Sequence, residues 1–261
     1  MNMVPMPGKD YTLKLPKGYL SYSQLDTFLR CPMQYQFRYV AGRPSLTTSA
    51  AFEGTALAAA LEAVGRRIME GKYKPEVSFA LKEHAAFLKK ESSSVDRWDN
   101  GDDPKKLRER GEFFLASFFD QGHADQLKPV HVEHEFITQI AGVEVRGVAD
   151  VVEPNYVFDF KVYKSLRFLN AEKSLQLSLY AHVFQKTRVG YIVFLKEGKK
   201  PIEIVTAERD LEKTRKWLEI TVSNVAMSIS NGSFAPCNPS ENFLCHSQWC
   251  ESFGECYGKA D

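Results

Sequence analysis

The sequence lacks long apolar runs and carries almost no net charge. No stretch approaches the ~20 consecutive apolar residues of a membrane-spanning helix, and the opening MNMVPMPGKD lacks the apolar core of a signal peptide. We therefore expect a cytoplasmic protein. Because 34 Lys and Arg residues are balanced by 33 Asp and Glu residues, a nucleic-acid partner would require local rather than overall positive charge.

Two stretches of the chain offer such local positive charge. The first contains Arg66, Arg67, Lys72 and Lys74, and the second contains Lys161, Lys164, Arg167 and Lys173. Each stretch fits an ordinary solvated surface as well as a nucleic-acid contact. The charge pattern alone therefore selects neither interpretation.

Cysteine is scarce until the end of the chain. Cys31 stands alone, whereas Cys237, Cys245, Cys250 and Cys256 lie close to the C-terminus. An odd and uneven set of cysteines in a protein expected to be cytoplasmic disfavours a disulfide framework and favours metal or cluster ligation. Buried free thiols are the alternative interpretation.

Hydrophobic periodicity predicts an α/β protein. Helices are predicted over residues 23–31, 50–71, 75–91, 104–121, 171–185 and 208–229, and strands over 129–140, 143–152, 156–162, 190–195 and 202–208. Ser23 and Asp26 resemble a capping box, and Pro32 ends or redirects the first helix. The first three strands read as an antiparallel meander. This order predicts one domain over 1–230, with a mixed sheet flanked by helices, and a cysteine-rich tail over 231–261 that packs around Cys31.

Two aspartates and a lysine stand in apolar strands. Asp150 lies in VEVRGVADVV, and Asp159 and Lys161 lie in YVFDFKV. Neighbouring strands are ~4.8 Å apart, so paired strands would bring both carboxylates to one spot, where Mg²⁺ or Mn²⁺ relieves their repulsion. Lys161 projects to the same strand face as Asp159. Such a site suits phosphodiester hydrolysis, whereas a buried Asp159–Lys161 salt bridge is the plainer interpretation.

These segments resemble, in order, the motifs of the PD-(D/E)xK nuclease superfamily in the form used by RecB-like nucleases. GVAD and FDFK match G-x-x-D and D-x-K, QLSLYA matches Q-x-x-x-Y, and VHVEHEF matches the strand before G-x-x-D. Upstream, LSYSQLDTFLRCPMQYQFRY and FEGTALAAALE resemble the opening C-P segment and the G-T-x-x-H-x-x-x-E helix. The resemblance covers almost the whole chain and implies a restriction-endonuclease-like fold.

The resemblance implies site roles for Asp150, Asp159, Phe160, Lys161, Gln176 and Tyr180. The two aspartates and the backbone carbonyl of the phenylalanine would bind the metal, and the lysine would serve catalysis. The glutamine and tyrosine, four residues apart on one helix face, would contact the scissile strand or order water. For the tyrosine, a place in the core is an equal alternative.

One position departs from the family pattern. The histidine expected four residues after Gly54, which supplies a metal ligand in relatives, is Ala58 here. The change is either a natural loss or an engineered one. Glu62, one turn further on, is an alternative ligand or an ordinary surface residue. We expect this helix to lie against the metal site, since Gly54 permits close backbone approach, and we expect the chain to bind DNA and metal yet to cut slowly.

For the cysteines, the resemblance to RecB-like iron–sulfur exonucleases, which include CRISPR-associated and AddB-type members, implies a [4Fe-4S] cluster. Its ligands would be Cys31, Cys245, Cys250 and Cys256, with Cys237 as a spare that could replace any of them. The C-x₄-C-x₅-C spacing differs from the C-x₂-C-x₅-C that is more common in relatives. A Cys₄ zinc site is the competing interpretation.

Together these expectations describe a metal-dependent DNA exonuclease. Its substrate would be single-stranded or end-resected DNA in recombination, repair or phage DNA metabolism, and an oligomer or a protein partner is compatible with the sequence. A DNA-binding or assembly module with a decayed active site is the alternative from another class, because Ala58 replaces a ligand. RNA processing is a third reading.

Overall fold

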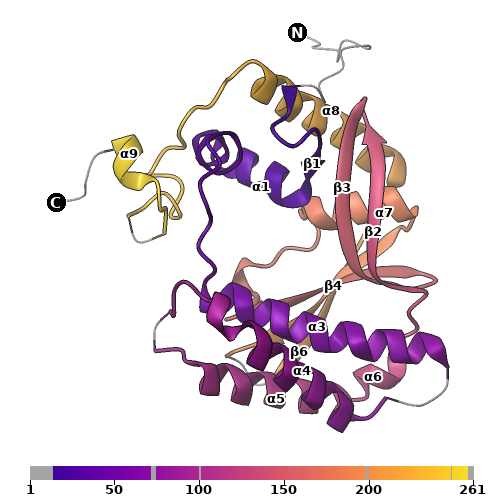
Figure 1. Cartoon of the computed structure of the whole chain (residues 1–261). Helices are drawn as coiled ribbons and strands as arrows, with labels where there is room; N and C mark the ends of the chain where they lie inside the picture. Colours follow the sequence, from indigo (N-terminus) through magenta and orange to yellow (C-terminus); the bar gives the residue numbers. More distant parts are fainter. Residues whose placement is uncertain (1–13, 72–74, 100, 198–199, 248, 258–261) are drawn as a thin grey trace. The chain divides into compact units, whose positions relative to one another are not determined.

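The computed structural model describes residues 14–71, 75–99, 101–197, 200–247 and 249–257, and these form two compact units (Figure 1). The first unit is made of the described parts of Met1–Ser45, Ile137–Gly147 and Arg215–Asp261, and the second of those of Leu46–Phe136 and Val148–Thr214. Among the described helices, none combines the length and the apolar character that a bilayer crossing requires.

Helices make up much of the second unit. They are α3 (Ser49–Glu70), α4 (Val77–Glu91), η3 (Ser92–Ser94), α5 (Pro104–Asp120), α6 (His123–Gln126), η4 (Leu166–Phe168) and α7 (Leu175–Phe184). Helix α3 begins after Thr48, whose hydroxyl accepts a hydrogen bond from the backbone N–H of Ala51, and it ends at Gly71 with a φ of 67°. The helices predicted over 50–71, 75–91 and 104–121 are confirmed, with small shifts at their ends.

The sheet of the second unit is mixed. Its strands are the second half of β3 (Val143–Val152), β4 (Tyr156–Tyr163), β5 (Arg188–Leu195) and β6 (Ile202–Glu208). Strand β4 pairs antiparallel with β3 and parallel with β5, and β6 pairs antiparallel with β5. A parallel pair needs a long crossover connection, and α7 forms part of it. The predicted α/β class, a mixed sheet flanked by helices, is confirmed.

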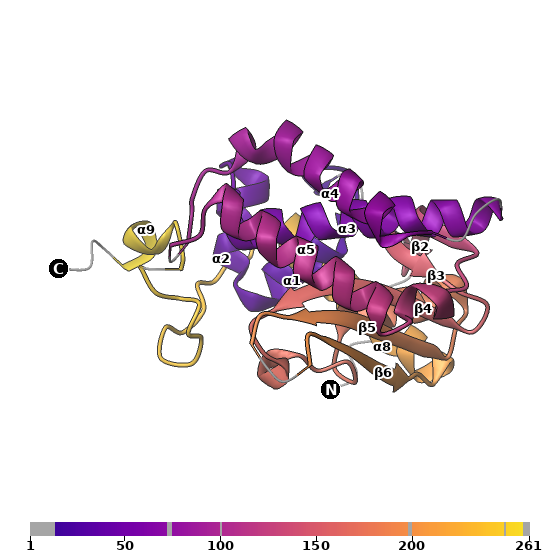
Figure 2. The same cartoon turned by 90° about the horizontal axis from the view of Figure 1, so that it is seen from below.

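The two faces of this sheet bury different helices. Successive strand residues point to opposite faces, so Phe194 of β5 packs with Phe114 of α5, whereas Val193 belongs to the cluster that contains Leu177 of α7. Figure 2 shows α3, α4 and α5 on one side of β5 and β6. The same alternation along β4 places Asp159 on the face that α7 covers.

The first unit contains the start and the end of the chain. Its elements are β1 (Leu20–Ser21), α1 (Tyr22–Arg30), α2 (Pro32–Tyr35), the π-helix η2 (Gln36–Val40), most of α8 (Leu211–Ser230) and α9 (Phe253–Tyr257). Strand β1 pairs in parallel with the first half of β3. Strand β2 (His131–Ile140) pairs with β3 across a turn at Ala141 and Gly142, which both have positive φ, as a tight type I′ hairpin requires. The predicted hairpin is therefore confirmed.

Helix starts are where the prediction was least accurate. The N-cap of α1 is Ser21, which accepts a hydrogen bond from the N–H of Gln24, and not the predicted Ser23. Pro32 redirects the chain rather than ending the helical region, because it occupies the first turn of α2, where a missing N–H is harmless. Helix α7 begins at Leu175 instead of residue 171, since the Ser174 hydroxyl caps it.

Candidate active site and cysteine-lined cavity

Pairing of β3 with β4 brings the two aspartates together. Val151 pairs with Phe158, and Asp150 and Asp159 are the next residues along the two strands. Asp150 Oδ2 accepts a 2.7 Å hydrogen bond from the backbone N–H of Phe160. The geometry that the sequence analysis required, two carboxylates on adjacent strands, is therefore present.

Lys161 lies beside the second aspartate on the same strand. Its Nζ is 2.5 Å from Asp159 Oδ2 and 5.9 Å from the centre of the Tyr191 ring. The Asp159 side chain is 2 % exposed and the Lys161 side chain 28 %, so the carboxylate is shielded from water more fully than the ammonium group. The contact agrees with both interpretations of the D-x-K motif, a catalytic site or a structural salt bridge.

Helix α7 supplies two further polar groups to Asp159. Gln176 Nε2 donates to Asp159 Oδ1 at 2.5 Å and to Tyr180 Oη at 2.9 Å. The Tyr180 hydroxyl lies 3.0 Å from Asp159 Oδ1 and 2.8 Å from the carbonyl oxygen of Val148, and its single hydrogen serves these two acceptors. Helical spacing of four residues aims both side chains at the same carboxylate.

Burial and mutual charge perturb the ionisation of this group. Burial, and next the charge of Asp159, raise the pKa of Asp150 to about 8. Burial by itself lowers the pKa of Lys161, but the charge and the hydrogen bond of Asp159 outweigh it and hold the pKa above its ordinary value. Burial raises the pKa of Tyr180, which therefore stays a neutral hydroxyl at ordinary pH. Strong perturbation of neighbouring groups is typical of functional sites.

The donor set fits a hard divalent cation. Gln176 Oε1 is buried and accepts no hydrogen bond from the described residues, whereas Asp159 Oδ2 contacts the ammonium group of Lys161. A buried acceptor without a partner calls for a ligand. Asp150 and Asp159 contribute carboxylate oxygens, and Mg²⁺ or Mn²⁺ readily completes its coordination with water. Over the described ranges, no three His, Cys, Asp or Glu side chains converge as a ready-made metal site.

Glu133 is a third acid close to this group, and the sequence analysis missed it. It lies in β2 with a φ of 45°, a left-handed conformation that is uncommon for a residue other than glycine. Burial, then the charges of Glu62 and Asp159, raise the pKa of Glu133, whereas Arg66 lowers it. In the sequence Glu133 is one member of an alternating strand, so no local pattern distinguishes it.

Helix α3 carries Ala58, which replaces the metal-ligating histidine of relatives, and Glu62, the alternative ligand. Its apolar residues, such as Leu61, pack on the sheet together with Phe160. Ala58 is half-buried, and Glu62 Oε1 binds Arg66 at 2.7 Å. A Cβ added to Gly54 would meet no described atom within 4 Å, so the expected close backbone approach at this glycine does not occur among the described residues.

The basic stretches are largely engaged in contacts of their own. Arg66 pairs with Glu62, and the Arg67 guanidinium lies 4.4 Å from the centre of the Phe79 ring. Lys164 Nζ is 3.3 Å from Glu197. The remaining members of the first stretch, Lys72 and Lys74, lie outside the described residues.

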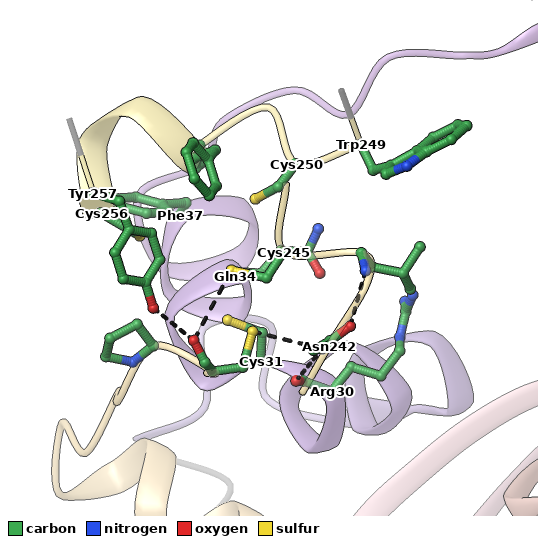
Figure 3. Close-up of a pocket in the computed structure, with 15 residues that line it drawn as sticks. Arg30, Cys31, Gln34, Phe37, Asn242, Cys245, Trp249, Cys250, Cys256 and Tyr257 are labelled. Carbon is green, nitrogen blue, oxygen red and sulfur yellow. Dashed lines mark hydrogen bonds between the residues drawn. The ribbon is translucent and has the colours of Figure 1, made fainter. Parts of the chain in front are cut away.

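The five cysteines line one cavity of about 80 Å³ in the first unit (Figure 3). Cys31 comes from the junction of α1 and α2, and the other four come from the C-terminal segment. Hydrogen bonds join these segments: the backbone N–H of Met33 donates to the carbonyl oxygen of Ala235, and the side-chain Nδ2 of Asn242 donates to that of Arg30. The structure thus gathers the cysteines that the sequence analysis selected and the spare in one place.

Cys237 accepts hydrogen bonds at both its thiol and its backbone carbonyl. Asn242 Nδ2 lies 3.5 Å from its Sγ, and Tyr257 Oη donates to its carbonyl oxygen at 2.6 Å. Burial, and next its hydrogen bonds with Cys245 and Cys31, raise the pKa of Cys237 to about 12. Five thiols around one cavity are a donor set that fits iron–sulfur or zinc chemistry, although the described thiols are not gathered in a ligating arrangement.

Comparison with known proteins identifies the family. The family model of the PD-(D/E)XK nuclease superfamily matches residues 19–256. The chain therefore belongs to the PD-(D/E)XK nuclease superfamily, whose members usually use divalent metals. The comparison does not distinguish the RecB-like iron–sulfur branch within it. No curated protein matches the sequence.

One solved structure supports the fold. The chain resembles a candidate exonuclease from Eubacterium rectale with a TM-score of 0.58 at 13 % identity, over 92 % of this chain and 93 % of that one. It also matches SSO0001 with a TM-score of 0.39 at 15 % identity, over 92 % and 96 % of the two chains. The first likeness shows a shared fold, and the second is too weak to carry an argument.

Proposed function

We propose that this chain is a metal-dependent deoxyribonuclease that acts as an exonuclease on single-stranded or end-resected DNA in recombination, repair or phage DNA metabolism. The observation that carries the proposal is the convergence of Asp150, Asp159 and Lys161 from two paired strands, with Gln176 and Tyr180 directed at the same carboxylate. Membership of a nuclease superfamily supports the reaction class, and the name of the Eubacterium rectale relative supports exonuclease action.

In this proposal, Asp150, Asp159 and the carbonyl of Phe160 hold the cation. When bound, a divalent cation polarises a phosphoryl oxygen and lowers the pKa of water. Lys161 stabilises negative charge that develops on the phosphoryl group. Gln176 and Tyr180 hold the Asp159 carboxylate in place, since both hydrogen-bond its Oδ1 atom.

The proposal is tested by digesting 5′- and 3′-labelled single-stranded and double-stranded DNA with Mg²⁺, with Mn²⁺ and with a chelator. We expect mononucleotides or short oligonucleotides to be released from free ends of the single strand, and only when metal is present. A closed single-stranded circle is the matched control and should resist an exonuclease. Cleavage of the circle would make the enzyme an endonuclease, and cleavage of RNA alone would change the substrate class.

A second candidate function is a DNA-binding or assembly module with a weakened active site. Ala58 favours it, because this position supplies a metal-ligating histidine in the family that the sequence resembles. Ala58→His distinguishes the two functions. A nuclease that lacks only this ligand should cut DNA faster with the histidine, whereas a module selected only for binding has no need to retain the other catalytic residues and should still fail to cut.

We also propose that the cysteines hold a [4Fe-4S] cluster, with zinc as the alternative, and that this group fixes the tail over 231–261 to the domain over 1–230. The support is the shared cavity lined by Cys31 and the four C-terminal cysteines. Four cysteine ligands are sufficient for either metal group, so one of the five thiols is not needed.

A further inference from the structure

A second, smaller groove of about 60 Å³ in the first unit adjoins the cysteine-lined cavity. The two share Gln34, Phe37, Trp249 and Ser252 as lining residues. Two arginines, Arg38 and Arg43, line only the groove, together with one acidic residue, Glu251. Its described lining therefore combines aromatic rings with an excess of positive charge.

Trp249 is the most unusual member of this lining. Its side chain is 48 % exposed, and Figure 3 shows the indole extending away from the cysteines. The exposed indole lines the groove together with Phe37 and the two arginines. The indole face is therefore available for stacking.

The arginines of the groove are arranged beside other rings. The Arg43 guanidinium lies 4.4 Å from the centre of the Phe37 ring and also pairs with Glu255. The Arg38 guanidinium is exposed and lies 5.4 Å from the centre of the Tyr39 ring. Lys17 Nζ is 5.6 Å from the same ring. Cation–π contact holds these side chains in place. The charge of Arg38 remains in solvent, whereas that of Arg43 is paired with Glu255.

The local backbone adds an independent observation. Phe37, Arg38 and Tyr39 all lie in the π-helix Gln36–Val40. Such π-helical turns are rare and occur frequently at functional sites. In this protein the π-helix directs both an aromatic ring and a cation to the groove.

We infer that this groove binds single-stranded nucleic acid, with a base stacked on Trp249 and the backbone phosphates held by Arg38 and Arg43. The inference rests on the proposed function and adds a binding site apart from the candidate active site. Aromatic stacking platforms beside cationic side chains are the usual means of binding single strands without sequence preference. A base paired inside a duplex cannot present its face to the indole, so the groove favours single strands over duplexes.

The test is equilibrium binding of a fluorescein-labelled oligothymidylate of about 16 nucleotides, measured by anisotropy in a chelator so that cleavage cannot interfere. We expect Trp249→Ala to weaken binding about tenfold and Trp249→Phe to restore most of it, because stacking needs only an aromatic face. Arg38→Ala should reduce the slope of log affinity against log salt by about 0.7, the value for one phosphate contact with a single strand. Duplex DNA of the same length should bind more weakly to the parent protein.

Trp217→Ala is the matched control for the indole, since Trp217 is 43 % exposed on α8 of the same unit. Arg108→Ala is the control for charge, because Arg108 is an exposed arginine paired with Glu112. Equal affinities for Trp249→Ala and Trp217→Ala would overturn the inference, as would an unchanged salt slope in Arg38→Ala. If the parent cuts DNA while Trp249→Ala binds the oligonucleotide with parental affinity, the inferred binding groove is disproved and the proposed nuclease function is retained. If the parent binds the oligonucleotide through Trp249 but never cuts DNA, the binding groove is retained and the proposed nuclease function is disproved.

Discussion

Lys161 Nζ lies 2.5 Å from Asp159 Oδ2, although the same carboxylate also receives Gln176 and Tyr180 at its other oxygen. A structural salt bridge between Asp159 and Lys161 does not require the additional hydrogen bonds from Gln176 and Tyr180. Among the described residues, Asp159 Oδ1 contacts Gln176 and Tyr180, whereas Oδ2 contacts Lys161 alone. A bound cation would share Oδ2 with the lysine, and the additional donors at Oδ1 favour the catalytic interpretation of the D-x-K motif.

Lys161→Ala separates these interpretations. If the lysine stabilises developing charge, the variant should bind Mn²⁺ about as well as the parent, yet lose at least about 100-fold in cleavage rate. Asp159→Ala should instead lose metal affinity. Calorimetry with Mn²⁺, combined with a timed digest, measures both quantities. A Lys161→Ala variant that unfolds more easily but cuts at the parental rate would identify the pair as a structural salt bridge.

Asp150→Asn should change how stability depends on pH. With its pKa raised from 3.8 to about 8, Asp150 in the folded protein keeps a proton that the unfolded chain releases between these values. The free energy of unfolding contributed by this group therefore falls as pH rises from about 4 to about 8. The metal-free variant lacks this loss, so its stability relative to the parent should increase across that range.

Thermal unfolding of metal-free parent and Asp150→Asn at several pH values measures the effect, because titrations of all other groups cancel in the difference. The same variant should bind Mn²⁺ more weakly. A constant difference between the two proteins from pH 4 to pH 8 would show that Asp150 is not protonated in the folded state.

The sequence predicted what depends on short-range periodicity. Asp159 and Lys161 share a face because strands alternate, and Gln176 and Tyr180 share one because helices repeat near four residues. Glu133 could not be found in this way, because its left-handed φ of 45° depends on how β2 packs and not on its neighbours in sequence. The distribution of charge around it is likewise a property of the folded chain.

Short elements were also beyond prediction. Strand β1 has only two residues and exists because it pairs with Val145 and Arg146, far along the chain. The π-helix Gln36–Val40 was not predicted from the sequence, and Pro32 before it suggested an end as readily as a change of direction. Tertiary contacts decide such features, whereas the long helices and strands carry their own pattern.

Gly111→Ala should destabilise the second unit. A Cβ at Gly111 of α5 would lie 2.1 Å from Cε1 of His84 on α4, and His84 is 1 % exposed. Overpacking of this kind costs about 1–3 kcal/mol, which exceeds the gain of up to ~1 kcal/mol that alanine brings to a helix. Urea unfolding should show a lower midpoint.

Gly54→Ala is the matched control for Gly111→Ala. Gly54 is also a helical glycine, but its added Cβ would meet nothing within 4 Å, so the helix-propensity gain should appear unopposed. Equal midpoints for the two variants would mean that α4 and α5 are not in the close contact described.

The cysteine-bound group should depend on Cys31. Anaerobically purified protein should be brown with broad absorption near ~400 nm, which indicates an iron–sulfur centre, and Cys31→Ala should lose the colour and melt at a lower temperature. Cys237→Ala is the comparison variant and should keep the colour if it is the spare. Near-stoichiometric zinc without iron would identify the alternative metal, and loss of colour in Cys237→Ala would place this residue among the ligands.

Ala58→His should raise the cleavage rate. The charge of Glu133 interacts with those of both Glu62 and Asp159. Glu62 lies on α3 one turn after Ala58, so this part of the helix lies within electrostatic range of an acid that also interacts with the candidate metal ligand Asp159. A histidine at position 58 would add a neutral nitrogen ligand, and catalytic rates depend strongly on ligand geometry. We expect an increase of at least about tenfold, equivalent to ~1.4 kcal/mol of activation free energy.

The binding of DNA should change little in Ala58→His, because phosphate contacts dominate affinity. Ala58→Gln is the control, since it adds a polar side chain of similar reach without an imidazole. A parent that already cuts at a rate that histidine does not improve would assign the missing ligand to another residue. Glu62→Gln and Glu133→Gln would then identify it, because only the true ligand should lower Mn²⁺ affinity and cleavage together. A histidine variant that binds Mn²⁺ more tightly but still fails to cut would instead favour the DNA-binding module.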